Sequence, residues 1–207
     1  MIKDIIFDMD GTLWDSSENV ARSWSEAAAE LTDKRFTAKD IQSVMGMPMD
    51  KIAERFFADE TEETRRKIME LCCDGENDYL RKHGGEIYSD TVPVFKELSK
   101  TCRLFIVSNC QSGYIEAFLD YYGLWEYIAD RLCWGDNELP KSENIRLIMR
   151  RNNIENALYV GDTQTDCDSA YAAGAKFAFA AYGFGTADRY DIKLNRLSEL
   201  PEMLKKM

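Results

Sequence analysis

The chain has 207 residues, of which 45% are hydrophobic, and it carries a formal net charge of −11. That length suits one domain with an insertion or two small domains, and the apolar content is ordinary for a globular protein. The negative charge argues against nucleic acid as the main partner, and it disfavours anionic substrates unless a bound divalent cation reverses the local field.

The N-terminal segment has no basic stretch followed by a long apolar one, so no signal peptide is expected. No apolar run approaches the roughly 20 residues needed to span a bilayer. We therefore expect a soluble cytoplasmic protein that does not bind membranes.

The first predicted element is a strand over residues 3–7, and it leads into two carboxylates, Asp8 and Asp10. In a strand, residues i and i+2 point the same way, so both carboxylates can face one pocket at the strand's carboxyl end. Gly11 then allows a sharp turn and a close approach to a ligand. Such a pair suits phosphoryl transfer, in which one carboxylate attacks and the other moves protons.

Helical patterns follow this strand. Apolar residues recur at helical spacing from Val20 to Leu31, and further helices are expected over residues 38–45, 49–57 and 60–82. No strand is expected between Leu13 and Gly85. Residues 15–85 are therefore predicted to form an all-helical insert.

Strands and helices alternate after the insert. Strands are predicted over residues 103–107, 130–134, 158–160 and 176–180, and helices over residues 92–100, 114–121, 142–151 and 169–173. Short apolar strands alternating with helices indicate an α/β fold with a parallel sheet covered on both faces.

Reactive side chains follow three of these strands. Asp8 and Asp10 follow the first, Ser108 the second, and Asp162 a later one, with Asp166 four residues further on. Ligands of open parallel sheets bind at the carboxyl ends of the strands. Carboxylate oxygens suit Mg²⁺, which binds phosphate beside one or two carboxylates, so we expect Asp8, Asp162 and Asp166 to form a magnesium site.

Four motifs in order resemble those of the haloacid dehalogenase (HAD) superfamily, in its capped phosphatase branch. They are Asp8–Thr12 (DMDGT), Ile106–Asn109, Lys141, and Gly161–Thr163 with Asp166. The resemblance spans nearly the whole chain. It implies a Rossmann-like parallel-sheet core formed by residues 1–14 and 86–207, and an inserted all-helical C1 cap formed by residues 15–85.

The resemblance also implies roles for single residues. Asp8 would be the nucleophile that forms an aspartyl-phosphate, and Asp10 would be the general acid and base. The phosphate contacts would be Thr12, Ser108, Asn109 and Lys141. The Mg²⁺ ligands would be Asp8, the backbone carbonyl of Asp10, Asp162 and Asp166. The implied partner is a small phosphorylated metabolite bound by a monomer or homodimer.

The sequence around Lys141 departs from the family, because Leu139-Pro140-Lys141-Ser142 lacks the usual Lys-Pro order. Lys176 and Lys193 are conceivable substitutes for it, although neither has the matching sequence context. Cys110 follows the second motif, where inert packing is favoured over a catalytic thiol.

The leading functional hypothesis is a Mg²⁺-dependent phosphatase of a small phosphate monoester, similar to phosphoglycolate phosphatases, with specificity set by the cap loop around residues 46–49. One alternative is a sugar phosphomutase of the β-phosphoglucomutase type. Those mutases carry a cap-hinge histidine where this chain has Val20. The other alternative is a catalytically idle binding protein on the same fold.

Overall fold

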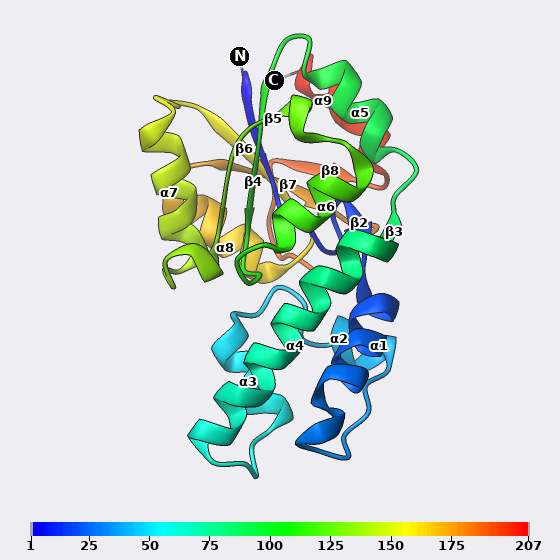
Figure 1. The fold of residues 1–207 in the computed structure, drawn as a ribbon. Coiled ribbons are helices and arrows are strands. Elements are labelled where there is room, and N and C mark those ends of the chain that lie inside the picture. Colours follow the sequence, from blue (N-terminus) through cyan, green and yellow to red (C-terminus); the bar gives the residue numbers. More distant parts are fainter. Residues whose placement is uncertain (1, 207) are drawn as a thin grey trace.

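A six-stranded parallel sheet forms the centre of the computed structural model, which describes residues 2–206. The strand order is β5-β4-β1-β6-β7-β8, and neighbouring strands pair in parallel (Figure 1). The strands are β1 (Asp4–Phe7), β4 (Arg103–Ser108), β5 (Ile128–Cys133), β6 (Ala157–Gly161), β7 (Lys176–Ala180) and β8 (Ile192–Leu194).

Helices cover both faces of this sheet because side chains alternate along each strand. In β1, Ile5 and Phe7 belong to one buried cluster and Ile6 to the other. The first cluster includes residues of α5, α6 and α9, and the second includes residues of α7 and α8. These helices are α5 (Thr91–Leu98), α6 (Tyr114–Tyr122), α7 (Lys141–Arg151), α8 (Gln164–Ala173) and α9 (Leu200–Leu204).

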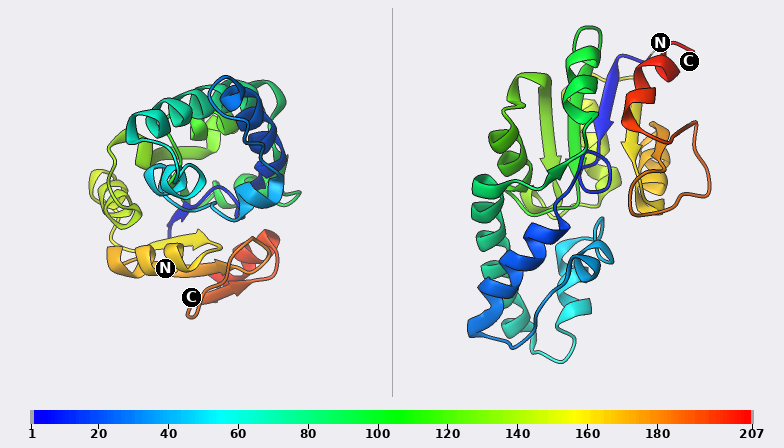
Figure 2. Two further views of the ribbon diagram at one scale, coloured as in Figure 1. Left: turned by 90° about the horizontal axis from the view of Figure 1, so that it is seen from below. Right: turned by 90° about the vertical axis from the view of Figure 1, so that its right-hand side faces the viewer.

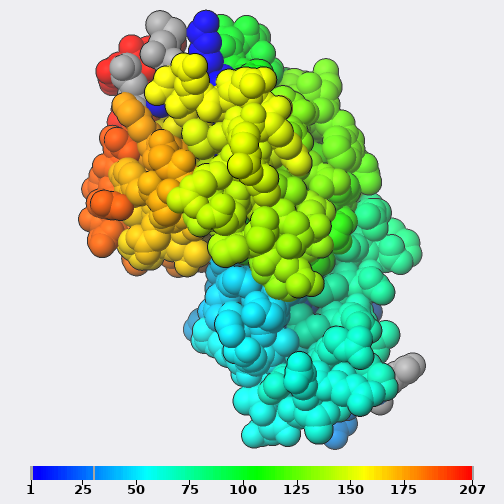
Figure 3. Space-filling model, turned by 90° about the vertical axis from the view of Figure 1, so that its left-hand side faces the viewer, coloured from blue at the N-terminus to red at the C-terminus, as the bar shows by residue number. Residues whose placement is uncertain are grey.

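The remaining helices form a separate group, here called the helical unit, beyond the carboxyl end of β1 (Figures 1 and 2). They are α1 (Ser17–Ala27), α2 (Ala38–Gln42), α3 (Met49–Phe56) and α4 (Glu62–His83). Trp24 packs edge-on against Phe36 and Phe56 at the centre of this unit. In the space-filling view the helical unit, in cyan and teal, lies directly against the sheet layer (Figure 3).

Two short strands carry the chain into and out of the helical unit. β2 (Trp14–Asp15) pairs antiparallel with β3 (Glu86–Ile87). The expectation that no strand lies between Leu13 and Gly85 is therefore wrong at Trp14. A two-residue strand is too short to show a periodic pattern, and only its tertiary pairing defines it. The division of the chain at residues 15 and 85 stays a prediction.

The α/β fold class with its parallel sheet and helical insertion is confirmed. The structure adds β8 and α9, which the pattern did not predict, and short 3-10 turns at Ala28–Glu30, Trp125–Tyr127, Trp134–Asp136 and Leu197–Glu199. α8 begins at Gln164 and not at Ser169, because Thr163 and Asp166 form a reciprocal capping box there. Within residues 2–206, no helix combines the length and the apolar character that crossing a membrane requires.

Candidate active site

Three carboxylates converge at the carboxyl edge of the sheet. Asp8 follows β1, Asp162 follows the neighbouring strand β6, and Asp166 lies in the first turn of α8. One oxygen of each lies within 4.8 Å of the others, and all three side chains are buried. We call this group the acidic cluster. Pairing of β1 with β6 brings the first two together, and the capping box of α8 fixes the third.

Lys141 provides the positive charge of this cluster. Its Nζ lies 2.6 Å from Asp166 Oδ1 and 3.1 Å from Asp8 Oδ1, and its side chain is 1% exposed. Burial lowers the pKa of Lys141, but the charges of Asp166 and Asp8 outweigh burial and raise it above its ordinary value. Lys141 therefore stays an ammonium. Both sequence alternatives, Lys176 and Lys193, are exposed.

The carboxylates differ in the contacts that their oxygens make. Asp166 accepts hydrogen bonds from the backbone N–H and the hydroxyl of Thr163, besides its ion pair with Lys141. Asp162 Oδ2 accepts from the backbone N–H groups of Phe184 and Gly185, whereas Asp162 Oδ1 is buried and has no hydrogen-bond partner within residues 2–206. Asp162 thus keeps a free ligand oxygen, and both oxygens of Asp166 are occupied by the chain.

One ammonium does not neutralise three buried carboxylates. Burial and the neighbouring charge of Asp166 raise the pKa of Asp8 to about 6, although Lys141 opposes this shift. Burial and the charges of Asp166 and Asp8 raise the pKa of Asp162 to about 8. A hard divalent cation would favour the ionised form of both groups, and the carboxylate donor set fits Mg²⁺.

Close backbone contacts hold the acidic cluster in place. Gly11 adopts a positive φ of 76°, and a Cβ there would lie 2.3 Å from Asp162 Oδ2. The loop that follows β7 approaches from the other side, where Tyr182 donates a 2.8 Å hydrogen bond to the backbone carbonyl of Thr12. Residues 182–185, which follow the last strand that the sequence predicted, therefore contact the site directly.

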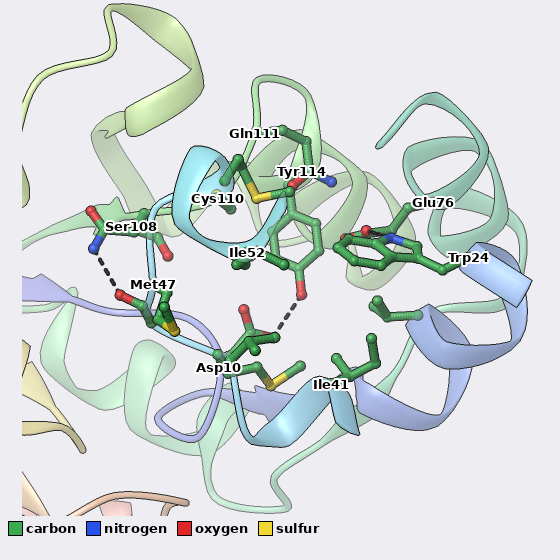
Figure 4. Close-up of a pocket in the computed structure, with 16 residues that line it drawn as sticks. Asp10, Trp24, Ile41, Met47, Ile52, Glu76, Ser108, Cys110, Gln111 and Tyr114 are labelled. Carbon is green, nitrogen blue, oxygen red and sulfur yellow. Dashed lines mark hydrogen bonds between the residues drawn. The ribbon is translucent and has the colours of Figure 1, made fainter. Parts of the chain in front are cut away.

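Asp10 is held away from the cluster by different partners. Its Oδ1 accepts a hydrogen bond from the Tyr114 hydroxyl at 2.6 Å (Figure 4). The same oxygen accepts a second hydrogen bond from the Ser16 hydroxyl at 2.9 Å. Burial raises the pKa of Asp10 to about 7, against the lowering effect of the Tyr114 hydrogen bond. Asp10 can therefore carry or release a proton near neutral pH, which is the property that a general acid and base requires.

The other expected phosphate contacts lie at different depths. Ser108 and Asn109 line a cavity together with Asp10, and Asn109 donates a 2.8 Å hydrogen bond to the backbone carbonyl of Gly46 in the helical unit. Thr12 is fully buried, and its hydroxyl has no hydrogen-bond partner among the described residues. The structure therefore brings Ser108 and Asn109 to the cavity and leaves Thr12 beneath it.

A family model described as haloacid dehalogenase-like hydrolase matches residues 5–180, a range that contains Asp8, Asp10, Lys141, Asp162 and Asp166. The chain belongs to this family. Among relatives, phosphoglycolate phosphatases from Cereibacter sphaeroides and Aquifex aeolicus are 25% and 26% identical to this HAD-like hydrolase. The alignments cover 98% and 97% of this chain, and 98% and 95% of those proteins.

Solved structures support the same fold. A protein described as a predicted phosphoglycolate phosphatase from Haemophilus somnus superposes with a TM-score of 0.84 at 18% identity. The superposition covers 98% of each chain. At this identity the likeness shows the HAD-like fold alone.

The sequence pattern does not predict several side chains of this HAD-like hydrolase that contact Asp10 or line the cavity. Tyr114 and Ser16 contact Asp10, and Glu76 of α4 is buried in the cavity wall. The sequence pattern indicates only that Tyr114 lies in the helix over residues 114–121. A charged residue at an apolar position of α4 was the available signal for Glu76, but the predominantly charged composition of that helix obscured it. Cys110 is buried, which raises the pKa of its thiol well above the ordinary value and favours packing over catalysis.

Proposed function

We propose that this HAD-like hydrolase is a Mg²⁺-dependent phosphatase that hydrolyses a small phosphate monoester through an aspartyl-phosphate. The observation that carries the proposal is the arrangement of two unlike carboxylates. Asp8 is paired with Lys141 inside the acidic cluster, whereas Asp10 is held by hydroxyl groups at the edge of a cavity. This difference supports a reaction in which Asp8 attacks and Asp10 transfers protons.

In the first step, an oxygen of Asp8 attacks phosphorus and the bond from phosphorus to the ester oxygen breaks. The electron pair of that bond goes to the leaving oxygen, which takes the proton carried by Asp10. Lys141 and Ser108 bind the transferring phosphoryl group. The ammonium offsets the repulsion between an anionic nucleophile and an anionic substrate.

In the second step, Asp10 removes a proton from water, and the water oxygen attacks phosphorus. The bond to Asp8 breaks and inorganic phosphate is released. Asp8, Asp162 and the backbone carbonyl of Asp10 would hold Mg²⁺, while Asp166 positions Lys141 and completes the cluster. When bound, the cation supplies positive charge beside the phosphoryl oxygens.

The helical unit serves as a cap in this proposal. Asn109 of the sheet layer bonds Gly46 of the helical unit, so the loop at residues 46–49 closes over the site. Closure excludes water and bulky substrates. The relatives named phosphoglycolate phosphatase make a small phosphorylated metabolite the expected substrate. We expect the enzyme to act in the cytoplasm as a monomer or homodimer.

The two alternative functions, a phosphomutase and an idle binding protein, predict a different result from that of a phosphatase. Val20 lines the cavity and has no titratable group, so a phosphomutase that used this position for proton transfer would lack it here. An idle binding protein would not need Lys141 buried between Asp8 and Asp166. Both alternatives predict no release of phosphate from simple esters.

Phosphate release from a panel of small monoesters, measured with Mg²⁺ and with EDTA, tests the proposal. Asp8→Asn should abolish release and keep the wild-type melting profile. Asp168→Asn is the matched control, since it makes the same change at an exposed position of α8 and should retain activity. Normal turnover by the Asp8 variant, or equal turnover in EDTA, would contradict the proposal.

A further inference from the structure

The cavity beside Asp10 is where the leaving group must lie. Asp10 is part of its wall, together with Ser108, whereas the three members of the acidic cluster are not. Since Asp10 protonates the leaving oxygen in the proposed reaction, the part of the substrate beyond that oxygen enters this cavity. Figure 4 shows the cavity extending from Ser108 and Asp10 towards Trp24 and Glu76.

The cavity is small and mostly apolar. Its volume is about 50 Å³, which is room for on the order of four water-sized groups. Side chains of the helical unit supply most of the wall, among them Val20, Trp24, Ile41, Met47 and Ile52. The leaving alcohol is therefore short.

The cavity offers no positive charge to a second anion. None of its described lining residues is Lys, Arg or His. Its two side-chain amides already donate to the chain, Asn109 to the Gly46 carbonyl and Gln111 to Asn77 Oδ1. A carboxylate on the leaving group would therefore lose its hydration without gaining an ion pair, and that loss is costly in an apolar cavity.

Glu76 lies in the part of the cavity wall that is far from Ser108 and Asp10, and its carboxyl group is a hydrogen-bond acceptor. This carboxyl is 3% exposed and accepts a hydrogen bond from the Trp24 indole N–H. Burial raises the pKa of Glu76 to about 8, and no cationic partner in the cavity offsets it. A buried carboxyl without a cationic partner favours a ligand that brings a hydrogen-bond donor.

We propose that the substrates are phosphate monoesters of short alcohols whose far end is a hydrogen-bond donor, a hydroxyl or an amine, and not a carboxylate, and that Glu76 selects them. The inference rests on the proposed phosphatase function and narrows it. It also separates this enzyme from its named relatives, because glycolate, the leaving group of phosphoglycolate, carries a carboxylate.

A matched series of esters tests the inference directly. Hydroxyethyl phosphate, aminoethyl phosphate, n-propyl phosphate and phosphoglycolate have leaving groups of similar length and differ mainly at the far end. We expect kcat/KM for the better of the two donor-bearing esters to exceed that for phosphoglycolate and for n-propyl phosphate by at least about tenfold. The ranking of the hydroxyl and amine esters identifies which donor the site prefers.

Glu76→Gln tests the assigned residue. Glutamine keeps the shape and an acceptor for Trp24 but cannot ionise. Measured above pH ~8, where Glu76 is a carboxylate, the preference over phosphoglycolate should therefore shrink several-fold in the variant, mainly through a lower KM for phosphoglycolate. Asp78→Asn is the matched control, because Asp78 is exposed on the same helix and should leave the preference unchanged. Melting curves of both variants establish that they are folded.

The outcomes separate the two proposals. No phosphate release by the wild-type enzyme from any ester would overturn the phosphatase function. Release that is fastest from phosphoglycolate, or equal for all four esters, would overturn the inference and leave the phosphatase function standing. An unchanged preference in folded Glu76→Gln would remove Glu76 as the selecting residue.

Discussion

Replacing Glu76 by glutamine should alter how the stability of the protein depends on pH. Glu76 has an ordinary pKa of 4.5, and burial in the folded protein raises it to about 8. The folded state therefore holds a proton that the unfolded chain releases throughout the interval between these values. Glutamine has the same shape and does not titrate, so a comparison of the two proteins isolates this proton.

The sign and size of this change in stability with pH follow from proton linkage. A raised pKa contributes stability that is fully present below the unfolded value and is lost as the pH rises through the folded value. Between the two pKa values the wild-type protein loses about 1.4 kcal/mol per pH unit relative to Glu76→Gln. From pH ~5.5 to ~7.5 the relative loss is about 3 kcal/mol, which corresponds to roughly 5–10 °C in Tm for a chain of this size.

Thermal melting of both proteins at the two pH values measures this effect. The difference in Tm, wild type minus variant, should fall by that amount at the higher pH. Asp78→Asn, which changes an exposed carboxylate of the same helix, should give a difference that varies little with pH. A pH-independent difference for Glu76→Gln would refute the reasoning, because folding would then leave the proton affinity of Glu76 unchanged.

Three further substitutions test other parts of the site. Lys141→Met should abolish turnover and lower the free energy of unfolding by about 3 kcal/mol, because it leaves buried carboxylates unpaired. Phosphate release measures the first effect and melting curves measure the second. A stable, active variant would contradict the ion-pair geometry. Tyr114→Phe removes a hydrogen bond that lowers the pKa of Asp10. The alkaline limb of the pH profile of kcat/KM should therefore move to higher pH, and the rate should fall about tenfold. An unmoved limb would exclude a role of Tyr114 in positioning Asp10. Gly183→Ala places a Cβ 2.4 Å from the Cβ of Asp162. If Mg²⁺ binds as proposed, it should raise the Tm of the wild type, and this rise should be smaller in the variant; an equal rise would show that the loop moves to accommodate the methyl group.

The positions of the polar residues at the strand ends were predictable, because they depend on local periodicity and on the order of the strands along the chain. A short apolar run ending in Asp8 indicates a buried strand, and parallel strands place their carboxyl ends at one edge. Pairing of β1 with β6 then brings Asp8 beside Asp162. The interpretation of Lys141 came from motif order alone, and the structure shows it contacting the carboxylates while Lys176 and Lys193 are exposed.

The cavity was not predictable in the same way, because its walls come from segments far apart in the chain. Tyr114 lies 104 positions from Asp10, and Trp24 lies 52 positions from Glu76, yet each pair is joined by a hydrogen bond. Periodicity assigns such residues to the buried side of a helix. It does not say which buried residues meet.

The sequence by itself determined the α/β class, the helical insertion and the order of the four motifs, since these follow from short-range patterns of apolar and charged residues. Only the tertiary structure decided the short β2–β3 ribbon, the partners of Asp10 and the absence of cationic side chains from the described wall of the cavity beside Asp10. The physical reason is that burial and electrostatic environment are properties of packed surfaces. Glu76 has an ordinary carboxyl on an isolated helix and acquires a raised pKa only when α4 packs against α1 and the sheet layer.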